Sequence, residues 1–181
     1  MMKTIRAMKI RFFTIPNLLT LSNLLCGTFA ALSALVYGNL EWAFWFVVLA
    51  AVFDFFDGFA ARLLHQNSPI GVQLDSLADM ISFGFVPAAV VYVMTTRSMG
   101  EEQFLLHCVY AFVSFAMAAF SALRLAKFNI DESQHEEFCG LPTPANALFF
   151  VSLGMISART GFDFGGQMLI CVAGEGWYQE E

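Results

Sequence analysis

The sequence predicts an all-α fold: an integral membrane helical bundle of five to six transmembrane helices. Two observations predict it. Of the 181 residues, 58% are hydrophobic, including 21 Phe, and only 13% are charged, against about 25% charged residues in average soluble chains. The apolar residues also gather into runs that approach the length of about 20 residues needed to cross a bilayer. A soluble fold of this composition would expose large apolar patches.

Five hydrophobic segments follow one another along the chain. The first opens at Pro16, which is tolerated in a first helical turn, and the second has Trp42 and Trp45 at its start as interfacial anchors. The fifth is shorter and follows two prolines, and a weaker apolar piece from Met168 is too short to span a membrane alone. The five predicted helices cover roughly residues 15–37, 41–64, 71–95, 104–128 and 145–158.

Basic residues near the helix ends indicate that the N-terminus lies in the cytoplasm. With alternating crossings, seven Lys and Arg residues fall on the cytoplasmic side and two on the other. The seven are Lys3, Arg6, Lys9, Arg11, Arg62, Arg124 and Lys127, and the two are Arg97 and Arg159. The connection between the second and third helices is then cytoplasmic. A net charge of -6, with no basic stripe beyond the N-terminus, argues against nucleic-acid binding.

Four aspartates lie in the second and third apolar helices, where ionisable groups are costly and mark functional sites. Asp54 and Asp57 are spaced i, i+3, and Asp75 and Asp79 i, i+4, so each pair occupies one helix face. Two facing pairs of carboxylates would repel each other, and Arg62 supplies only one positive charge. One or two divalent cations are the economical explanation, because carboxylate oxygens suit hard ions such as Mg²⁺.

The same stretch fits one continuous spacing pattern, D-x2-D-G-x2-A-R-x8-G-x3-D-x3-D. Its fixed positions are Asp54, Asp57, Gly58, Ala61, Arg62, Gly71, Asp75 and Asp79. On this pattern the chain is identified as a member of the CDP-alcohol phosphotransferase family. The stretches TIPNLLTLSNLLCG from Thr14, SALRLAKFNI from Ser121 and FCGLPTPANA from Phe138 resemble regions of bacterial phosphatidylserine synthases.

The resemblance implies transfer of the phosphatidyl group from CDP-diacylglycerol to L-serine, which gives phosphatidylserine and CMP. It places Mg²⁺ or Mn²⁺, as two ions, on the four aspartates of the pattern: Asp54, Asp57, Asp75 and Asp79. It makes Asp79 also the general base toward the serine hydroxyl, because a neutral hydroxyl is a poor nucleophile. The residues implied in CDP-diacylglycerol binding are Gly58, Ala61, Arg62, Gly71 and Asn17, and those in acceptor binding are Arg124 and Lys127.

The resemblance also implies a location and a partner: a multi-pass protein of a bacterial-type inner (cell) membrane, with its active site facing the cytoplasm, that forms a homodimer. Family members usually carry six or more spanning helices. Here the sequence divides into a transmembrane domain at 1–160 and a short atypical tail at 161–181, whose glycine-rich and acidic end does not continue a spanning pattern. We therefore expect a shortened C-terminus.

Three other functions stay open on the sequence. The same chemistry could use another alcohol, such as glycerol 3-phosphate or inositol phosphate. The chain could be an inactive truncated paralogue that binds CDP-lipid without turnover. A cation channel or transporter would instead need polar residues spread through the membrane depth along several helices, whereas the aspartates here gather at one end.

Overall fold

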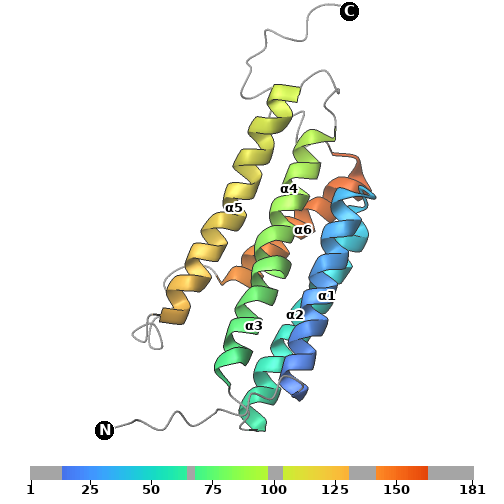
Figure 1. Ribbon diagram of the computed structural model, residues 1–181. Coiled ribbons are helices and arrows are strands. Elements are labelled where there is room, and N and C mark those ends of the chain that lie inside the picture. Colours follow the sequence, from blue (N-terminus) through green and yellow to red (C-terminus); the bar gives the residue numbers. More distant parts are fainter. Residues whose placement is uncertain (1–13, 65–67, 98–103, 131–141, 163–181) are drawn as a thin grey trace, which may run out of the picture.

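A computed structural model of the chain describes residues 14–64, 68–97, 104–130 and 142–162, and its regular structure is entirely helical within those ranges (Figure 1). The predicted all-α fold is confirmed. The basic N-terminal stretch, the apolar piece from Met168 and nearly all of the predicted tail lie outside the described residues. The elements are α1 (Ile15–Leu35), α2 (Leu40–Leu63), α3 (Pro69–Asp79), the π-helical segment η1 (Met80–Phe85), α4 (Val86–Thr96), α5 (Phe104–Ile130) and α6 (Thr143–Thr160).

The helices around the aspartates begin at residues that favour a helix start. The Thr14 side chain accepts a hydrogen bond from the Asn17 backbone N–H at 3.4 Å, and Ser68 accepts one from the Gly71 backbone N–H at 3.0 Å. Each cap is followed by a proline in the first turn, where the missing N–H costs nothing. These local signals fix where α1 and α3 begin.

The rod formed by α3, η1 and α4 is continuous from Pro69 to Thr96. The predicted third span, at about 71–95, is therefore one segment, as expected. Its middle, Met80–Phe85, is π-helical and follows Asp79 directly. Wider turns of this kind are rare and frequently occur at functional sites.

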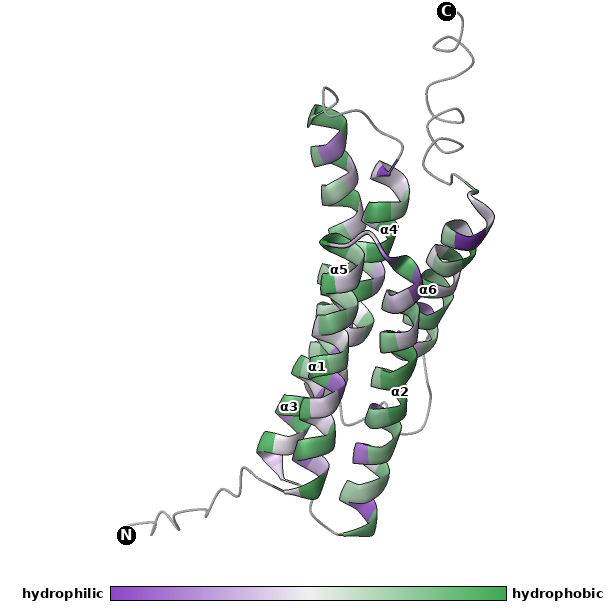
Figure 2. Cartoon of the chain, turned by 90° about the vertical axis from the view of Figure 1, so that its right-hand side faces the viewer, coloured by the Kyte–Doolittle hydropathy of each residue, from purple (hydrophilic) through white to green (hydrophobic). Residues whose placement is uncertain are grey.

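Within the described ranges, four helices are long and apolar enough to cross a membrane: Ile15–Leu35, Leu40–Leu63, Pro69–Thr96 and Phe104–Lys127. The 18-residue α6 is not among these four, but it packs against α2 and α4. The described part of the chain thus holds five helical rods, in keeping with the five to six predicted. Hydrophobic residues run along most of the helices (Figure 2), and outward side chains such as Phe112, 79% exposed, suit contact with lipid.

Small residues bring the rods close together. A Cβ atom at Gly27 of α1 would lie 2.9 Å from the Cα atom of Ser82, and one at Gly154 of α6 would lie 2.5 Å from Cγ1 of Val90. The α1–α2 contact buries alanines, including Ala30 and Ala34. Packing through small residues is the usual way in which membrane helices associate, since burial from water does not drive them together.

The elements alternate in direction, so one end of the bundle gathers the start of α1, the end of α2 and the start of α3 (Figure 1). The end of α5 points toward the same side. Arg62, Arg124 and Lys127 therefore lie toward this end, and Arg97 and Arg159 toward the other. The predicted sorting of these five basic residues between the two ends agrees with the structure.

Candidate functional site

Three of the four aspartates come together between α2 and α3. One carboxylate oxygen from each of Asp54, Asp57 and Asp75 lies within 4.8 Å of those of the other two. Asp57 is buried, with 4% of its surface exposed, and the other two side chains are half-buried. Helix α1 packs against both α2 and α3, and it holds the two aspartate-bearing helices in place on either side of the cluster.

Two buried oxygens of this cluster lack a hydrogen-bond partner among the described residues: Oδ2 of Asp57 and Oδ1 of Asp75. A buried polar atom without a partner costs about 1–3 kcal/mol, and more when it is charged. A divalent cation bound by three carboxylates would satisfy both atoms and offset the repulsion between the side chains. The donors are all carboxylate oxygens, as hard cations such as Mg²⁺ and Mn²⁺ prefer. The residues therefore fit a divalent metal site.

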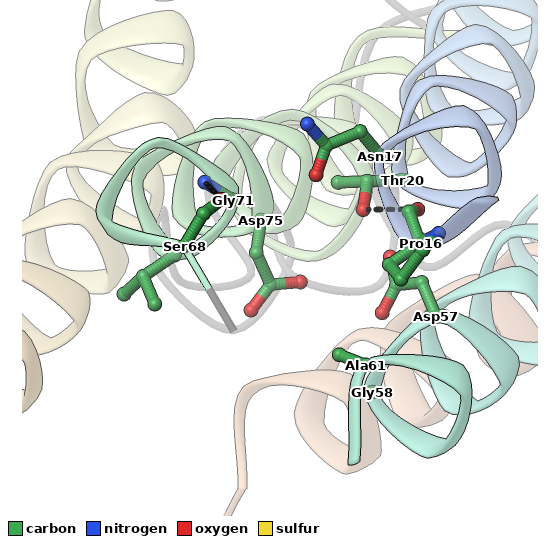
Figure 3. Close-up of a pocket in the computed structure, with 10 residues that line it drawn as sticks. Pro16, Asn17, Thr20, Asp57, Gly58, Ala61, Ser68, Gly71 and Asp75 are labelled. Atoms are coloured by element: carbon green, nitrogen blue, oxygen red, sulfur yellow. Dashed lines mark hydrogen bonds between the residues drawn. The ribbon is translucent and has the colours of Figure 1, made fainter. Parts of the chain in front are cut away.

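An open cleft adjoins the cluster. Asp57 and Asp75 face each other across it, from α2 and α3 (Figure 3). Gly58 leaves space in the cleft, because a Cβ atom there would meet nothing within 4 Å. The lining residues are Pro16, Asn17, Thr20, Asp57, Gly58, Ala61, Ser68, Gly71, Val72 and Asp75.

Helix α1 supplies a polar wall to this cleft. Asn17 and Thr20 are both buried, and the Thr20 hydroxyl donates to the carbonyl oxygen of Pro16 at 3.1 Å (Figure 3). A Cβ atom at Gly71 would lie 3.2 Å from Oδ1 of Asn17. The close approach of α3 to α1 at this point therefore depends on a residue without a side chain.

Asp79 lies one turn beyond Asp75, outside the group of three carboxylates. It is half-buried and close enough to Asp54 to interact with it directly. Its Oδ1 atom accepts a hydrogen bond from Nδ2 of Asn23 on α1 at 3.3 Å. An amide from α1 thus holds Asp79 in place.

The remaining predicted site residues divide into two groups. Asn17, Gly58, Ala61 and Gly71 line the cleft. The three basic residues, Arg62, Arg124 and Lys127, do not line it. Arg62 is exposed in the last turn of α2, and the other two lie on α5.

The sequence-based prediction missed Thr20 and Ser68 in the cleft wall, and it missed Asn23 beside Asp79. A signal for two of them was present. Asn17, Thr20 and Asn23 are spaced three residues apart in a mostly apolar helix, so they form a polar stripe along one side of it. Only the packing of α1 against α2 and α3 shows that this stripe faces the aspartates.

Comparisons with known proteins agree with this geometry. A protein called CDP-diacylglycerol–serine O-phosphatidyltransferase in Bacillus subtilis is 34% identical over 77% of this chain and 74% of its own length. Proteins of the same name in Helicobacter pylori and Methanocaldococcus jannaschii are 34% and 31% identical over 83% and 78% of this chain. The matches cover 61% and 60% of those two proteins, so the chain spans less than two thirds of their length.

No solved structure matches the chain. Residues 13–174 match the family model described as CDP-alcohol phosphatidyltransferase. This match covers most of the chain and includes all four aspartates and the cleft between α1, α2 and α3. The chain therefore belongs to the CDP-alcohol phosphatidyltransferase family.

Proposed function

We propose that the chain transfers the phosphatidyl group of CDP-diacylglycerol to the hydroxyl of L-serine, giving phosphatidylserine and CMP. The observation that carries the proposal is the group of three carboxylates at the wall of an open cleft, in a family whose similar members bear the name of this activity. A cleft at the end of a membrane bundle suits the substrates. Lipid tails can enter from the bilayer, while serine and the nucleotide face water.

The proposed cofactor is Mg²⁺ or Mn²⁺, as two ions held by Asp54, Asp57, Asp75 and Asp79. Bound there, the ions would neutralise the pyrophosphate of the liponucleotide and act as Lewis acids toward it. The unpartnered buried oxygens of Asp57 and Asp75 support this placement.

The cleft residues would hold the nucleotide part of CDP-diacylglycerol. Gly58 and Ala61 leave room for it on the α2 side, and Asn17 and Gly71 border the opposite wall. Arg62, at the end of α2, would contact a phosphate from the rim. Larger side chains at the two glycines would reduce the space for the cytidine or its phosphates.

Asp79 would act as the general base. It would take the proton from the serine hydroxyl as the serine oxygen forms a bond to the phosphorus that carries the diacylglycerol. The bond from this phosphorus to the oxygen of CMP breaks, and the electron pair leaves with CMP. Arg124 and Lys127 on α5 would bind the serine carboxylate by charge-assisted hydrogen bonds, since carboxylate recognition favours such cations.

The proposed setting is a bacterial-type inner (cell) membrane, with the cleft facing the cytoplasm and two copies of the chain forming a homodimer. The end of the bundle that carries the cleft also carries Arg62, Arg124 and Lys127, and cytoplasmic ends are enriched in such residues. Residues 1–160 would form the transmembrane domain, and 161–181 the separate tail.

The test is product formation by the purified, folded chain in mixed micelles that contain CDP-diacylglycerol. Radiolabelled phosphatidylserine and CMP should both appear when serine and Mg²⁺ or Mn²⁺ are present, and both should disappear with a chelator. Asp79→Asn should abolish formation of both. Glu41→Gln makes the same chemical change at the opposite end of the bundle and should leave the rate unchanged.

Other acceptors decide between the proposal and its alternatives. Release of CMP with glycerol 3-phosphate or inositol phosphate, but not with serine, would keep the chemistry and overturn the substrate. Binding of CDP-diacylglycerol without CMP release with any acceptor would identify an inactive paralogue.

A further inference from the structure

A fully buried asparagine on α1 connects Asp79 to the π-helical segment. Neither Asn23 nor Ser82 has any exposed surface. Nδ2 of Asn23 donates to Oδ1 of Asp79 at 3.3 Å. Oδ1 of Asn23 accepts from the Ser82 hydroxyl at 2.7 Å, and this hydroxyl also lies 3.2 Å from the backbone carbonyl oxygen of Asn23. Both ends of the asparagine amide are therefore paired.

These contacts fix which way the amide points. A carboxylate oxygen only accepts hydrogen bonds, so the NH₂ group of Asn23 must face Asp79. The Ser82 hydroxyl supplies the proton on the other side, toward the amide oxygen. A flipped amide would place its carbonyl oxygen against the carboxylate and lose the hydrogen bond to Asp79. Asp79 thus selects the orientation of the amide, and Ser82 binds the amide oxygen that this orientation presents to it.

The backbone around this pair is arranged for the contact. Ser82 follows Asp79 by three residues, so both side chains lie on one side of the rod, toward α1. Gly27, one turn after Asn23, allows the approach, because a Cβ atom there would lie 2.3 Å from the Ser82 hydroxyl oxygen. Buried polar groups are costly unless they are hydrogen-bonded, and here the amide oxygen of Asn23, one N–H of its amide and the Ser82 hydroxyl all have a partner.

We propose that Asn23, anchored by Ser82, is a positioning residue that sets the direction of the Asp79 carboxylate toward the acceptor hydroxyl. The inference rests on the proposed function, in which Asp79 receives the proton of that hydroxyl. With Oδ1 of Asp79 bound to Asn23, the carboxylate does not turn freely about its Cβ–Cγ bond. The asparagine touches neither substrate, and it acts through the angle and distance of proton transfer, to which reaction rates are very sensitive.

The experiment compares kcat and KM of the full chain in mixed micelles for the wild type, Asn23→Leu, Ser82→Ala and the double variant. Leucine keeps the number and branching of the side-chain heavy atoms of asparagine, although it is larger, and it removes both hydrogen bonds. We expect kcat to fall by about tenfold or more in Asn23→Leu, with KM values for CDP-diacylglycerol and serine within about twofold of the wild type. Ser82→Ala should lower kcat less. The double variant should be no slower than Asn23→Leu alone, because Ser82 acts through Asn23.

The matched control is Thr95→Val, which removes a buried hydroxyl from the same rod at its other end, where Thr95 donates only to backbone carbonyls of its own helix. It should leave kcat unchanged. Thermal unfolding in detergent reports whether each variant is folded. If Asn23→Leu does not fold, Ser82→Ala serves as the test variant. Its kcat should fall while its KM values stay unchanged.

The outcomes separate this inference from the function on which it rests. A wild type that forms no product with any acceptor overturns both. A wild type that forms phosphatidylserine, together with a folded Asn23→Leu variant of undiminished kcat, overturns only the positioning role. The positioning role is also overturned if Asn23→Leu loses kcat and CDP-diacylglycerol affinity to the same extent. It is overturned as well if the losses in kcat of the two single variants multiply in the double variant.

Discussion

Gly58 and Gly27 are both helical glycines near the aspartates, but a side chain would meet different surroundings at each. At Gly58 a Cβ atom has nothing within 4 Å and would project into the cleft. At Gly27 it would lie 2.9 Å from the backbone of Ser82, which cannot move aside as a flexible side chain can. One glycine leaves space for a ligand, and the other allows two helices to touch.

Exchange of each glycine for alanine should therefore change a different property of the protein. Gly58→Ala should keep the midpoint of thermal unfolding and raise the KM for CDP-diacylglycerol. Gly27→Ala should be destabilised by about 1–3 kcal/mol through overpacking. Thermal unfolding in detergent and steady-state kinetics measure the two effects. A Gly58→Ala variant that unfolds early, or a Gly27→Ala variant of unchanged stability, would contradict this distinction.

The carboxylate cluster makes a second prediction at this scale. Asp57→Asn keeps the shape of the side chain and removes a charge from the proposed metal site. Mn²⁺ binding, followed by electron paramagnetic resonance without substrate, should weaken by about tenfold or more, and phosphatidylserine formation should fall by about a hundredfold, since metal catalysis supplies several kcal/mol. Glu41→Gln is the control. Unchanged Mn²⁺ binding by Asp57→Asn would remove this residue from the site.

Helix α6 is held to its neighbours in two different ways. Arg159 in its last turn forms an ion pair with Glu41 in the first turn of α2, and both side chains are exposed. One turn earlier along α6, Gly154 lies directly against Val90 of α4. Exposed ion pairs contribute about 0–1 kcal/mol, whereas tight packing leaves no room for added atoms.

Arg159→Gln should accordingly lower stability by less than about 1 kcal/mol and leave the proposed activity intact, because the pair lies at the end away from the cleft. Gly154→Val should separate α6 from α4 and lower the midpoint of thermal unfolding clearly. Comparison of the two melting curves checks both statements. Equal destabilisation by the two changes would mean that the ion pair carries more of the contact than its exposure indicates.

The helices themselves were largely predictable from the sequence, because their apolar runs are long and the starts of α1, α2 and α3 carry capping residues. The aspartate faces were predictable as well, since i, i+3 and i, i+4 spacing depends only on helix geometry. The π-helical segment was not. Its residues MISFGF carry no local signal, and it forms where Ser82 contacts α1 and Gly84 lies against Ser121 of α5. Positions such as that of Arg124 also depend on packing between helices that are distant in sequence.

The whole molecule has two unlike ends, and this asymmetry bears on its orientation in the membrane. The end with the cleft carries Arg62, Arg124 and Lys127 among the described residues, and the proposed substrate serine and the product CMP are both soluble. Both facts favour a cytoplasmic cleft. The connection between α1 and α2, with Tyr37 exposed by 72%, lies at the opposite end.

Cysteine labelling tests this orientation. In a background with all native cysteines replaced by alanine, a membrane-impermeant maleimide applied to intact spheroplasts should label Tyr37→Cys. Leu64→Cys, at the end of α2, should be labelled only after the membrane is permeabilised. The reverse pattern would place the cleft on the outer side.

The continuous rod from Pro69 to Thr96 has a consequence for how insertions and deletions act on this chain. Its first part carries Asp75 and Asp79, and in its last part Val90 packs against Gly154 of α6. A π-helical turn holds one residue more than an α-helical turn, so loss of one residue from Met80–Phe85 can be absorbed by a return to α-helical turns. Loss of one residue from α3 or α4 has no such outlet and would rotate one part of the rod against the other by about 100°. The π-helical segment is therefore the place in the rod where a change of length misaligns the two faces least.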